Sequence, residues 1–326
     1  MKTIYIVAAI ALIVVAGVLG GLYVTGYFNP QTANIRIGYL QGDLHQLSLQ
    51  VAVAQGYFTQ RGINVTMYQY SSGPTLMQHF VAGELDFAYV GVPPSMQAYA
   101  SAIVNPNATY LPIIIASANQ EGSAVVVNPD EISSLSELNN SIIGTPGIGT
   151  IQDVLLSIYS TAYNLSITHY PSTNAQLVQQ FEAGSFDGYI AWEPTPSQGV
   201  IRANGTVILT SHDIMPNHQC CVLVVSSKFL ASNASVVSKV VDAHNAAMDF
   251  IVANPTQAKQ IAVNYTGLSA QIIDLAFNDV LYSKTVNVAS IRTFLIAKIE
   301  LGQITTVNLT QVDLFLSGFI SSQYVH

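Results

Sequence analysis

Apolar and polar positions along the chain follow a pattern that predicts strands alternating with helices. Residues 63–70 are apolar at alternate positions, which is typical of a strand with one buried face. A Ser72 cap and Pro74 in the first turn then predict a helix that continues through Val81. Further strands are predicted at 35–39, 113–116, 125–127, 142–144 and 222–225, and further helices at 47–55, 134–138, 151–163, 235–253, 255–264, 269–281, 290–298 and 310–320. This βαβαβ order favours a parallel sheet with helical crossovers.

One helix–turn–strand unit occurs twice, in residues 76–95 and again in residues 177–197. Each copy ends a helix at Gly, turns at an Asp, forms a short apolar strand and continues into a loop broken by Pro. Asp86 and Asp187 hold the turn position, and a turn-forming role is favoured for both. Two copies predict two similar α/β lobes with a cleft between them, where small molecules bind.

The chain is long enough for two such lobes, since 326 residues is about twice a typical domain of roughly 150 residues. We expect it to cross from the first lobe to the second near residues 119–122. We expect lobe 1 to comprise residues 34–118 and 220–326, and lobe 2 to comprise residues 119–219.

The N-terminus has the pattern of a membrane segment. Residues 4–24 carry no charge, and about 20 such residues span a bilayer core. Lys2 precedes this run, which favours an N-terminus inside the cell and the remaining chain outside. Residues 1–33 are therefore expected to be an anchor and a tether, with a cleaved signal peptide as the alternative. Acceptor sequons for N-glycosylation agree with an exterior location and begin at Asn64, Asn107, Asn139, Asn164, Asn204, Asn233, Asn264 and Asn308.

Charged residues are scarce. They make up 9% of the chain against an average of about 25%, and the net charge is −8. No basic run occurs in the sequence, which argues against nucleic acid as a partner. A surface with few carboxylates would change little when the medium becomes acidic, so the composition suggests an acid habitat as a hypothesis.

Candidate ligand-binding residues lie in loops that connect strands to helices. The amides of Gly149 and Thr150 are expected to face an anion at a helix start, and Ser72 and Gly73 have the same placement in the first lobe. Ordinary helix capping is the alternative for both loops. The remaining candidates are His45 and His218 (ligand contact or structural hydrogen bonds), Trp192 (cleft lining or core packing), Glu193 (hydrogen-bond acceptor or turn cap), and Gln41, Gly42, Tyr89 and Gly91.

The sequence offers little support for catalysis or for a metal. It has no G-x-S-x-G or H-E-x-x-H motif and no plausible pair of acid–base carboxylates, so no catalytic residue and no cofactor is expected. The run His218-Gln219-Cys220-Cys221 suggests metal ligands, but the sequence shows no second ligand pair. Two small buried residues before a strand are the favoured interpretation of the cysteines, and no metal site is expected.

The motifs taken together resemble the solute-binding proteins of nitrate, sulfonate, taurine and bicarbonate ABC importers, in the NMT1/THI5-like group. Blocks that carry the resemblance fall in order over about residues 34–260, and are Ile37-Gly38-Tyr39-Leu40, Ala54-Gln55-Gly56-Tyr57-Phe58, Ala82-Gly83-Glu84-Leu85-Asp86, Thr145-Pro146-Gly147-Ile148-Gly149-Thr150 and Asp187-Gly188-Tyr189-Ile190-Ala191-Trp192-Glu193-Pro194. The resemblance implies an α/β, two-lobed type II periplasmic-binding-protein fold, here with an N-terminal transmembrane helix. The combination of anchor and sequons suits an archaeal cell surface.

The resemblance implies capture of a small oxyanion outside the cell by lobe closure. An ABC permease and its ATPase would be the partners. Few cations lie near the predicted loops, so binding would rely on amides, hydroxyls and protonated His. The alternatives are a thiamine pyrimidine precursor as ligand, or an enzyme of the thiamine-precursor type, whose cysteine-rich element is absent because Val222 follows Cys221. A sensory ectodomain would need a cytoplasmic signalling segment before the anchor.

Overall fold

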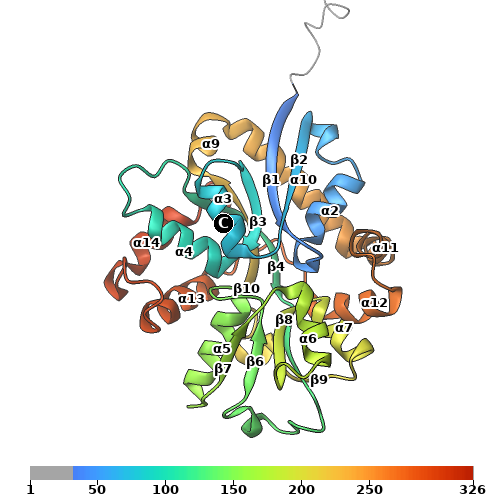
Figure 1. Cartoon of the computed structure of the whole chain (residues 1–326). Helices are drawn as coiled ribbons and strands as arrows, with labels where there is room; N and C mark the ends of the chain where they lie inside the picture. Colours follow the sequence, from blue (N-terminus) through green and yellow to red (C-terminus); the bar gives the residue numbers. More distant parts are fainter. Residues whose placement is uncertain (1–31, 326) are drawn as a thin grey trace, which may run out of the picture. The chain divides into compact units, whose positions relative to one another are not determined.

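Two β-sheets with helices around them form the described part of the chain, residues 32–325, in this computed structural model (Figure 1). Lobe 1 contains a sheet in the order β11-β4-β10-β3-β1-β2, and lobe 2 a sheet in the order β7-β6-β8-β5-β9. The lobe 1 strands are β1 (Ala33–Leu40), β2 (Ile63–Tyr70), β3 (Phe87–Gly91), β4 (Pro112–Glu121), β10 (Gln219–Ser226) and β11 (Val280–Leu281). The lobe 2 strands are β5 (Ser123–Val127), β6 (Ile142–Thr145), β7 (Thr168–Pro171), β8 (Gly188–Trp192) and β9 (Thr206–Thr210).

The helices that the sequence predicted lie close to their predicted ranges, and the structure adds helices at 92–102, 195–202 and 211–214. Lobe 1 contains α2 (Leu47–Ala54), α3 (Gly73–Val81), α4 (Val92–Ala102), α9 (Ser227–Ser232), α10 (Ala234–Ala253), α11 (Pro255–Thr266), α12 (Ala270–Asp279), α13 (Val288–Glu300) and α14 (Val312–Phe319). Lobe 2 contains α5 (Ile151–Ala162), α6 (Leu177–Glu182), α7 (Thr195–Arg202) and α8 (Ser211–Ile214). Short 3₁₀ turns occur at η1 (Leu44–Gln46), η2 (Thr59–Arg61), η3 (Leu135–Leu138), η4 (Asn174–Gln176) and η5 (Leu309–Gln311). Within residues 32–325, none of the helices combines the length and the apolar character that a bilayer span requires. The predicted anchor, residues 4–24, lies outside the described residues.

Each sheet mixes parallel and antiparallel strands, whereas the sequence predicted a parallel sheet. β1 pairs with β3 in parallel, and β6 pairs in parallel with both β7 and β8. β10 is antiparallel to β3 and β4, and β5 is antiparallel to β8 and β9. These two antiparallel strands are the ones that enter each lobe from the other, so they are not products of a local βαβ crossover.

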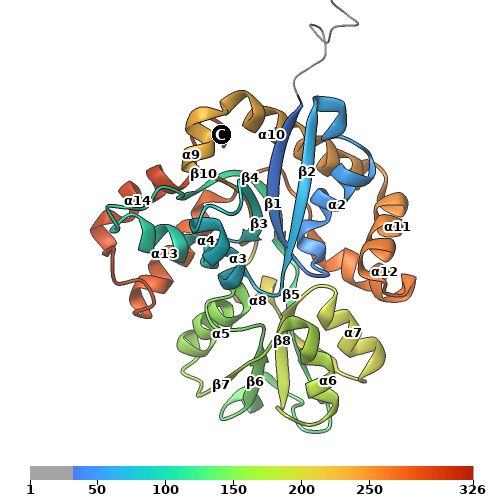
Figure 2. The ribbon, with the colours of Figure 1, turned by 45° about the horizontal axis from the view of Figure 1, so that its top comes forward.

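The chain crosses between the lobes twice. β4 of lobe 1 continues through Gly122 into β5 of lobe 2, and after α8 the chain returns into β10 (Figure 2). Gly122 has φ +87°, a conformation that residues with a Cβ rarely adopt. The first crossing is therefore a sharp junction between two strands of different sheets.

The repeated Asp residues have equivalent structural roles. Asp86 accepts a hydrogen bond from the backbone N–H of Arg36 at 2.9 Å and binds the Arg36 guanidinium. Asp187 accepts a hydrogen bond from the backbone N–H of Ile142 at 2.7 Å. In each lobe the carboxylate thus joins the turn before one strand to the parallel strand beside it. These hydrogen bonds explain both Asp residues as structural, so neither needs a role in ligand binding.

The proline segments at the ends of the two repeats are helix starts, so their prediction as loops is wrong. Pro93 and Pro94 lie in the first turn of α4, and Pro196 lies in the first turn of α7. The fixed φ of proline suits a first helical turn, and its missing N–H costs nothing there because the first amides of a helix have no partner within it. β3 therefore leads directly into α4, and β8 leads into α7 after Glu193 and Pro194.

Candidate functional site

Strand-to-helix connections from both lobes meet at one place. Gly91 ends β3 and caps α4, and Gly73 begins α3, both in lobe 1. Thr150 caps α5 in lobe 2, where its side chain accepts a hydrogen bond from Asp153 N at 3.4 Å. The amino-terminal ends of helices carry partial positive charge and amides without helical partners. Three such ends therefore approach one another across the boundary between the lobes.

A cavity of about 20 Å³ lies at this meeting point, and we call it the interlobe cavity. Five of the predicted ligand-binding residues line it, together with other side chains from both lobes: His45, Gly73, Gly91, Thr150 and Trp192, with Leu40, Asp43, Pro94, Ile151, Gln152 and Cys221. This volume is about that of one water molecule. A polyatomic ligand therefore needs the lobes to stand further apart than they do here.

The other predicted residues are spread over several places. Gln41 and Gly42 line a separate hollow of about 400 Å³, and Gly149 lines a third hollow of about 810 Å³ beside α3 and α4. The backbone N–H of Gly149 donates to the carboxylate of Asp153 at 2.8 Å. This amide therefore makes its hydrogen bond within its own loop, and it does not face the interlobe cavity.

Four of the predicted residues do not line the interlobe cavity: Ser72, Tyr89, Glu193 and His218. Ser72 caps α3, and its hydroxyl accepts from Thr75 N at 3.3 Å. The hydroxyl of Tyr89 bonds to Nδ1 of His244 at 3.0 Å, deep between β3 and α10. His244 lies within the predicted helix 235–253 and is fully buried. Glu193 and His218 are also buried, and their hydrogen bonds are described below.

The carbonyl oxygen of Gly122 joins the two lobes. It accepts a hydrogen bond from Nε2 of His45 at 2.7 Å and another from the backbone N–H of Glu193 at 2.9 Å. The backbone N–H of Leu44 donates to the Glu193 carbonyl at 3.2 Å. A Cβ on Gly122 would lie 2.5 Å from His45 Nε2, so only glycine permits this arrangement. The crossing segment, lobe 1 and lobe 2 are thus held together at the edge of the interlobe cavity.

Buried carboxyl groups dominate the electrostatics here, and no Lys or Arg among residues 32–325 lines the cavity. Burial raises the pKa of Asp43 to about 7 and the pKa of Glu193 to about 8. Burial by itself would lower the pKa of His45, but the charges of Cys220 and Asp43 outweigh it and raise that pKa to about 9. At mildly acidic pH both carboxyls are therefore largely neutral, while His45 carries a positive charge.

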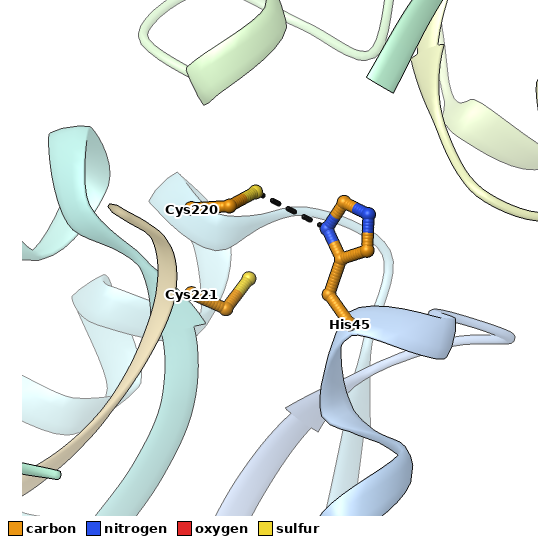
Figure 3. Close-up of side chains that lie close together, drawn as sticks. All are labelled: His45, Cys220 and Cys221. Atoms are coloured by element: carbon orange, nitrogen blue, oxygen red, sulfur yellow. Dashed lines mark hydrogen bonds between the residues drawn. The ribbon is translucent and has the colours of Figure 1, made fainter. Parts of the chain in front are cut away.

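Two thiols and one imidazole form a buried group at the lobe 1 side of the cavity, which we call the thiol–imidazole cluster: His45, Cys220 and Cys221 (Figure 3). Cys220 Sγ lies 3.2 Å from His45 Nδ1, and both cysteines are free thiols. This cluster could not be predicted from the sequence, because His45 stands 175 positions from Cys220. No local spacing could have indicated it, although His45 and the cysteines were each noted separately.

Comparison with known proteins identifies the family and the fold. The model of the NMT1-like family matches residues 29–265. A Brucella abortus protein named as a binding protein is 24% identical over 244 residues, which is 71% of each chain. The nitrate-binding protein NrtA from Synechocystis PCC 6803 has a TM-score of 0.79 at 15% identity, covering 90% of this chain and 88% of its own.

A second solved structure agrees. The alkanesulfonate-binding protein SsuA from Xanthomonas axonopodis pv. citri, bound to MOPS, has a TM-score of 0.73 at 16% identity, covering 86% of this chain and 98% of its own. These likenesses confirm the predicted two-lobed α/β periplasmic-binding-protein fold. Because the family model spans well over half of the sequence, the chain belongs to the NMT1-like family.

Proposed function

We propose that the protein is the extracellular substrate-binding component of an ABC importer and captures a small oxyanion of the sulfonate or nitrate class by lobe closure. The observation that carries this proposal is the meeting of helix starts from both lobes, at Gly73, Gly91 and Thr150, around one interlobe cavity. The ligands named for SsuA and NrtA support the oxyanion class.

The chemistry of the cavity suits a singly charged anion, which can be bound without a Lys or Arg side chain. Helix amino termini attract anions, and His45 adds a positive charge when it is protonated. Without a Lys or Arg in the lining, binding would depend on amides and hydroxyls rather than on a guanidinium clamp. This composition disfavours phosphate and other ligands with two negative charges.

Lobe closure is the proposed mechanism of capture. A ligand that contacts both lobes stabilises the closed arrangement, and the permease would recognise that arrangement. The hydrogen bonds of the Gly122 carbonyl to His45 and Glu193 add to the closed arrangement without help from a ligand. We place the protein on the outer face of the membrane, anchored by residues 4–24, with a permease and an ATPase as partners.

The proposal is tested by calorimetric titration of the full-length chain with nitrate, methanesulfonate, taurine and bicarbonate, and with a thiamine pyrimidine precursor as the competing class. Gly91→Ala should weaken anion binding more than tenfold. Its Cβ would lie 2.7 Å from Cδ1 of Ile151 in the opposite lobe, so the added methyl group would take up space between the lobes and oppose their closure around a ligand. Ile151→Ala in the same chain should restore most of the affinity, because it removes the atoms that the new methyl group meets.

The single variant Ile151→Ala serves as the matched control and measures what the loss of this cavity-lining side chain costs by itself. Binding of the pyrimidine precursor alone would contradict the oxyanion class. Anion binding that Gly91→Ala leaves unchanged would contradict capture by closure at this cavity.

A further inference from the structure

The three donor atoms of the thiol–imidazole cluster are placed as metal ligands would be. The His45, Cys220 and Cys221 donors all lie within 4.8 Å of one another, and each residue is buried (Figure 3). A tetrahedral zinc ion with Zn–S of about 2.3 Å and Zn–N of about 2.0–2.1 Å separates neighbouring ligand atoms by about 3.5–3.8 Å. The observed separation of 3.2 Å between Cys220 Sγ and His45 Nδ1 needs only a small adjustment.

A bulge in β10 brings the two thiols to the same side. Side chains of consecutive strand residues normally point to opposite faces of a sheet. Gln219 pairs with Gln120 of β4 and Cys221 pairs with Asn119, so Cys220 is an extra residue with no pairing partner in β4. A bulge of this kind redirects a side chain. Figure 3 shows both cysteine side chains extending toward His45.

The hydrogen bond of His45 to the crossing segment fixes its tautomer. A carbonyl oxygen only accepts, so the Nε2 atom that bonds to Gly122 O at 2.7 Å must carry a proton. In the neutral ring, Nδ1 then presents its lone pair to the thiol of Cys220. Histidines that bind metals usually donate their other N–H to a carbonyl or carboxylate in this way.

His218 supplies an independent indication. Its Nδ1 bonds to the Met215 carbonyl at 2.8 Å, which leaves Nε2 as the free ring nitrogen. That atom is buried and has no hydrogen-bond partner among residues 32–325, although a buried imidazole nitrogen normally has one. Burial acts to raise the pKa of the Cys220 thiol, but its contacts with Cys221, His45 and His218 outweigh burial and lower that pKa. A buried nitrogen with a free lone pair thus lies on a side chain that contacts Cys220.

We propose that His45, Cys220 and Cys221, with His218 as the fourth donor, bind one soft metal ion of the Zn(II) or Cu(I) kind. Two thiolates and imidazole nitrogens are the donor set that such ions prefer. When the ion binds, any proton still carried by either thiol or by Nδ1 of His45 is released to solvent. His45 and Cys221 also line the interlobe cavity, so the ion would enter when the lobes part. This site goes beyond the proposed oxyanion function and does not depend on it.

The test uses the full-length chain, reduced and freed of metal, with Zn(II) as the probe. Titration against a chromophoric chelator should show one tightly bound Zn(II) per chain. Co(II) in place of Zn(II) should give the visible absorption of a tetrahedral ion together with a thiolate-to-cobalt charge-transfer band. This second readout requires no substitution, so it holds even if a variant folds poorly.

Substitutions then identify the ligands. Cys220→Ser and Cys221→Ser should each weaken Zn(II) binding by more than about 100-fold, the upper end of what the loss of a supporting group costs. His218→Ala should also weaken it and change the Co(II) spectrum. His79→Gln is the matched control: that imidazole lies in the last turn of α3, is partly exposed and pairs with Glu84, so both readouts should stay unchanged.

Three results would overturn the proposal: no stoichiometric Zn(II) in the reduced chain, Zn(II) binding that survives both cysteine substitutions, or a Co(II) spectrum without thiolate absorption. Thermal melting of each metal-free variant shows whether it is folded. Titration of the same metal-free protein with nitrate and methanesulfonate measures the oxyanion function separately. The failure of one proposal therefore remains distinguishable from the failure of the other.

Discussion

The buried carboxyl group of Glu193 should make the stability of the protein depend on pH. Its side chain is only 2% exposed, and it accepts one weak hydrogen bond from Ser197 N at 3.3 Å. Burial is the main cause that raises its pKa from 4.5 to about 8, and the charge of Asp279 adds to the effect. His45 and Ser197 act in the opposite direction without cancelling it.

The sign of the effect follows from proton binding. Between pH 4.5 and about 8 the folded chain keeps the Glu193 proton, whereas the unfolded chain releases it. This contribution to the free energy of unfolding is fully present below pH 4.5 and is lost as the pH rises through about 8. At 1.36 kcal/mol per pH unit the loss has an upper limit of about 5 kcal/mol.

Glu193→Gln tests this reasoning, because glutamine has nearly the same shape and no charge to titrate. Urea unfolding, followed by circular dichroism, is measured for both chains at several pH values between about 4.5 and 8. The free energy of unfolding of the natural chain should fall relative to that of the variant as the pH rises. The comparison isolates Glu193 from other buried acids such as Asp43, which are common to both chains. Parallel pH profiles would refute the argument.

Three further predictions follow from the contacts described. Asp86→Ala should lower the free energy of unfolding in urea by about 1–3 kcal/mol, because the hydrogen bonds to Arg36 are lost, and it should leave ligand affinity unchanged. Reduced affinity in a stable variant would contradict this structural role. Tyr89→Phe should cost about 1 kcal/mol, from the lost bond to His244, and should also leave affinity unchanged; a large drop in affinity would assign Tyr89 to ligand binding. Deletion of residues 4–24 should move the protein from the membrane fraction to the soluble fraction, and an unchanged distribution would disprove the anchor.

Local signals were enough to predict most of the fold. The capping hydroxyl of Ser72 and the stop at Gly83 mark α3 in sequence, and the structure places the helix there. The two-lobe arrangement could be inferred from the repeat, because Asp86 and Asp187 mark the same turn in both copies. The loops predicted after β3 and β8 were wrong, since proline permits a first helical turn as readily as it breaks a helix.

The details of the site depend on contacts that no local pattern encodes. Loop position alone suggested that Gly149 faces an anion, but its N–H donates to the carboxylate of Asp153 instead. The thiol–imidazole cluster needs a bulge at Cys220 and the side chain of His45, which lies 175 positions away, and neither is visible as a spacing. Antiparallel β5 and β10 were missed for the same reason, because strand direction after a lobe crossing is set by the tertiary fold.

The central claim is that a small ligand binds between the lobes. Trp192 is the only tryptophan of the chain; it lines the interlobe cavity, and its indole N–H has no hydrogen-bond partner among residues 32–325. Titration of the full-length chain with nitrate and methanesulfonate, followed by tryptophan emission, therefore reports directly on this cavity. We predict a saturable change in emission with the same dissociation constant that calorimetry gives. Tight binding by calorimetry with unchanged Trp192 emission would place the ligand elsewhere and contradict the account.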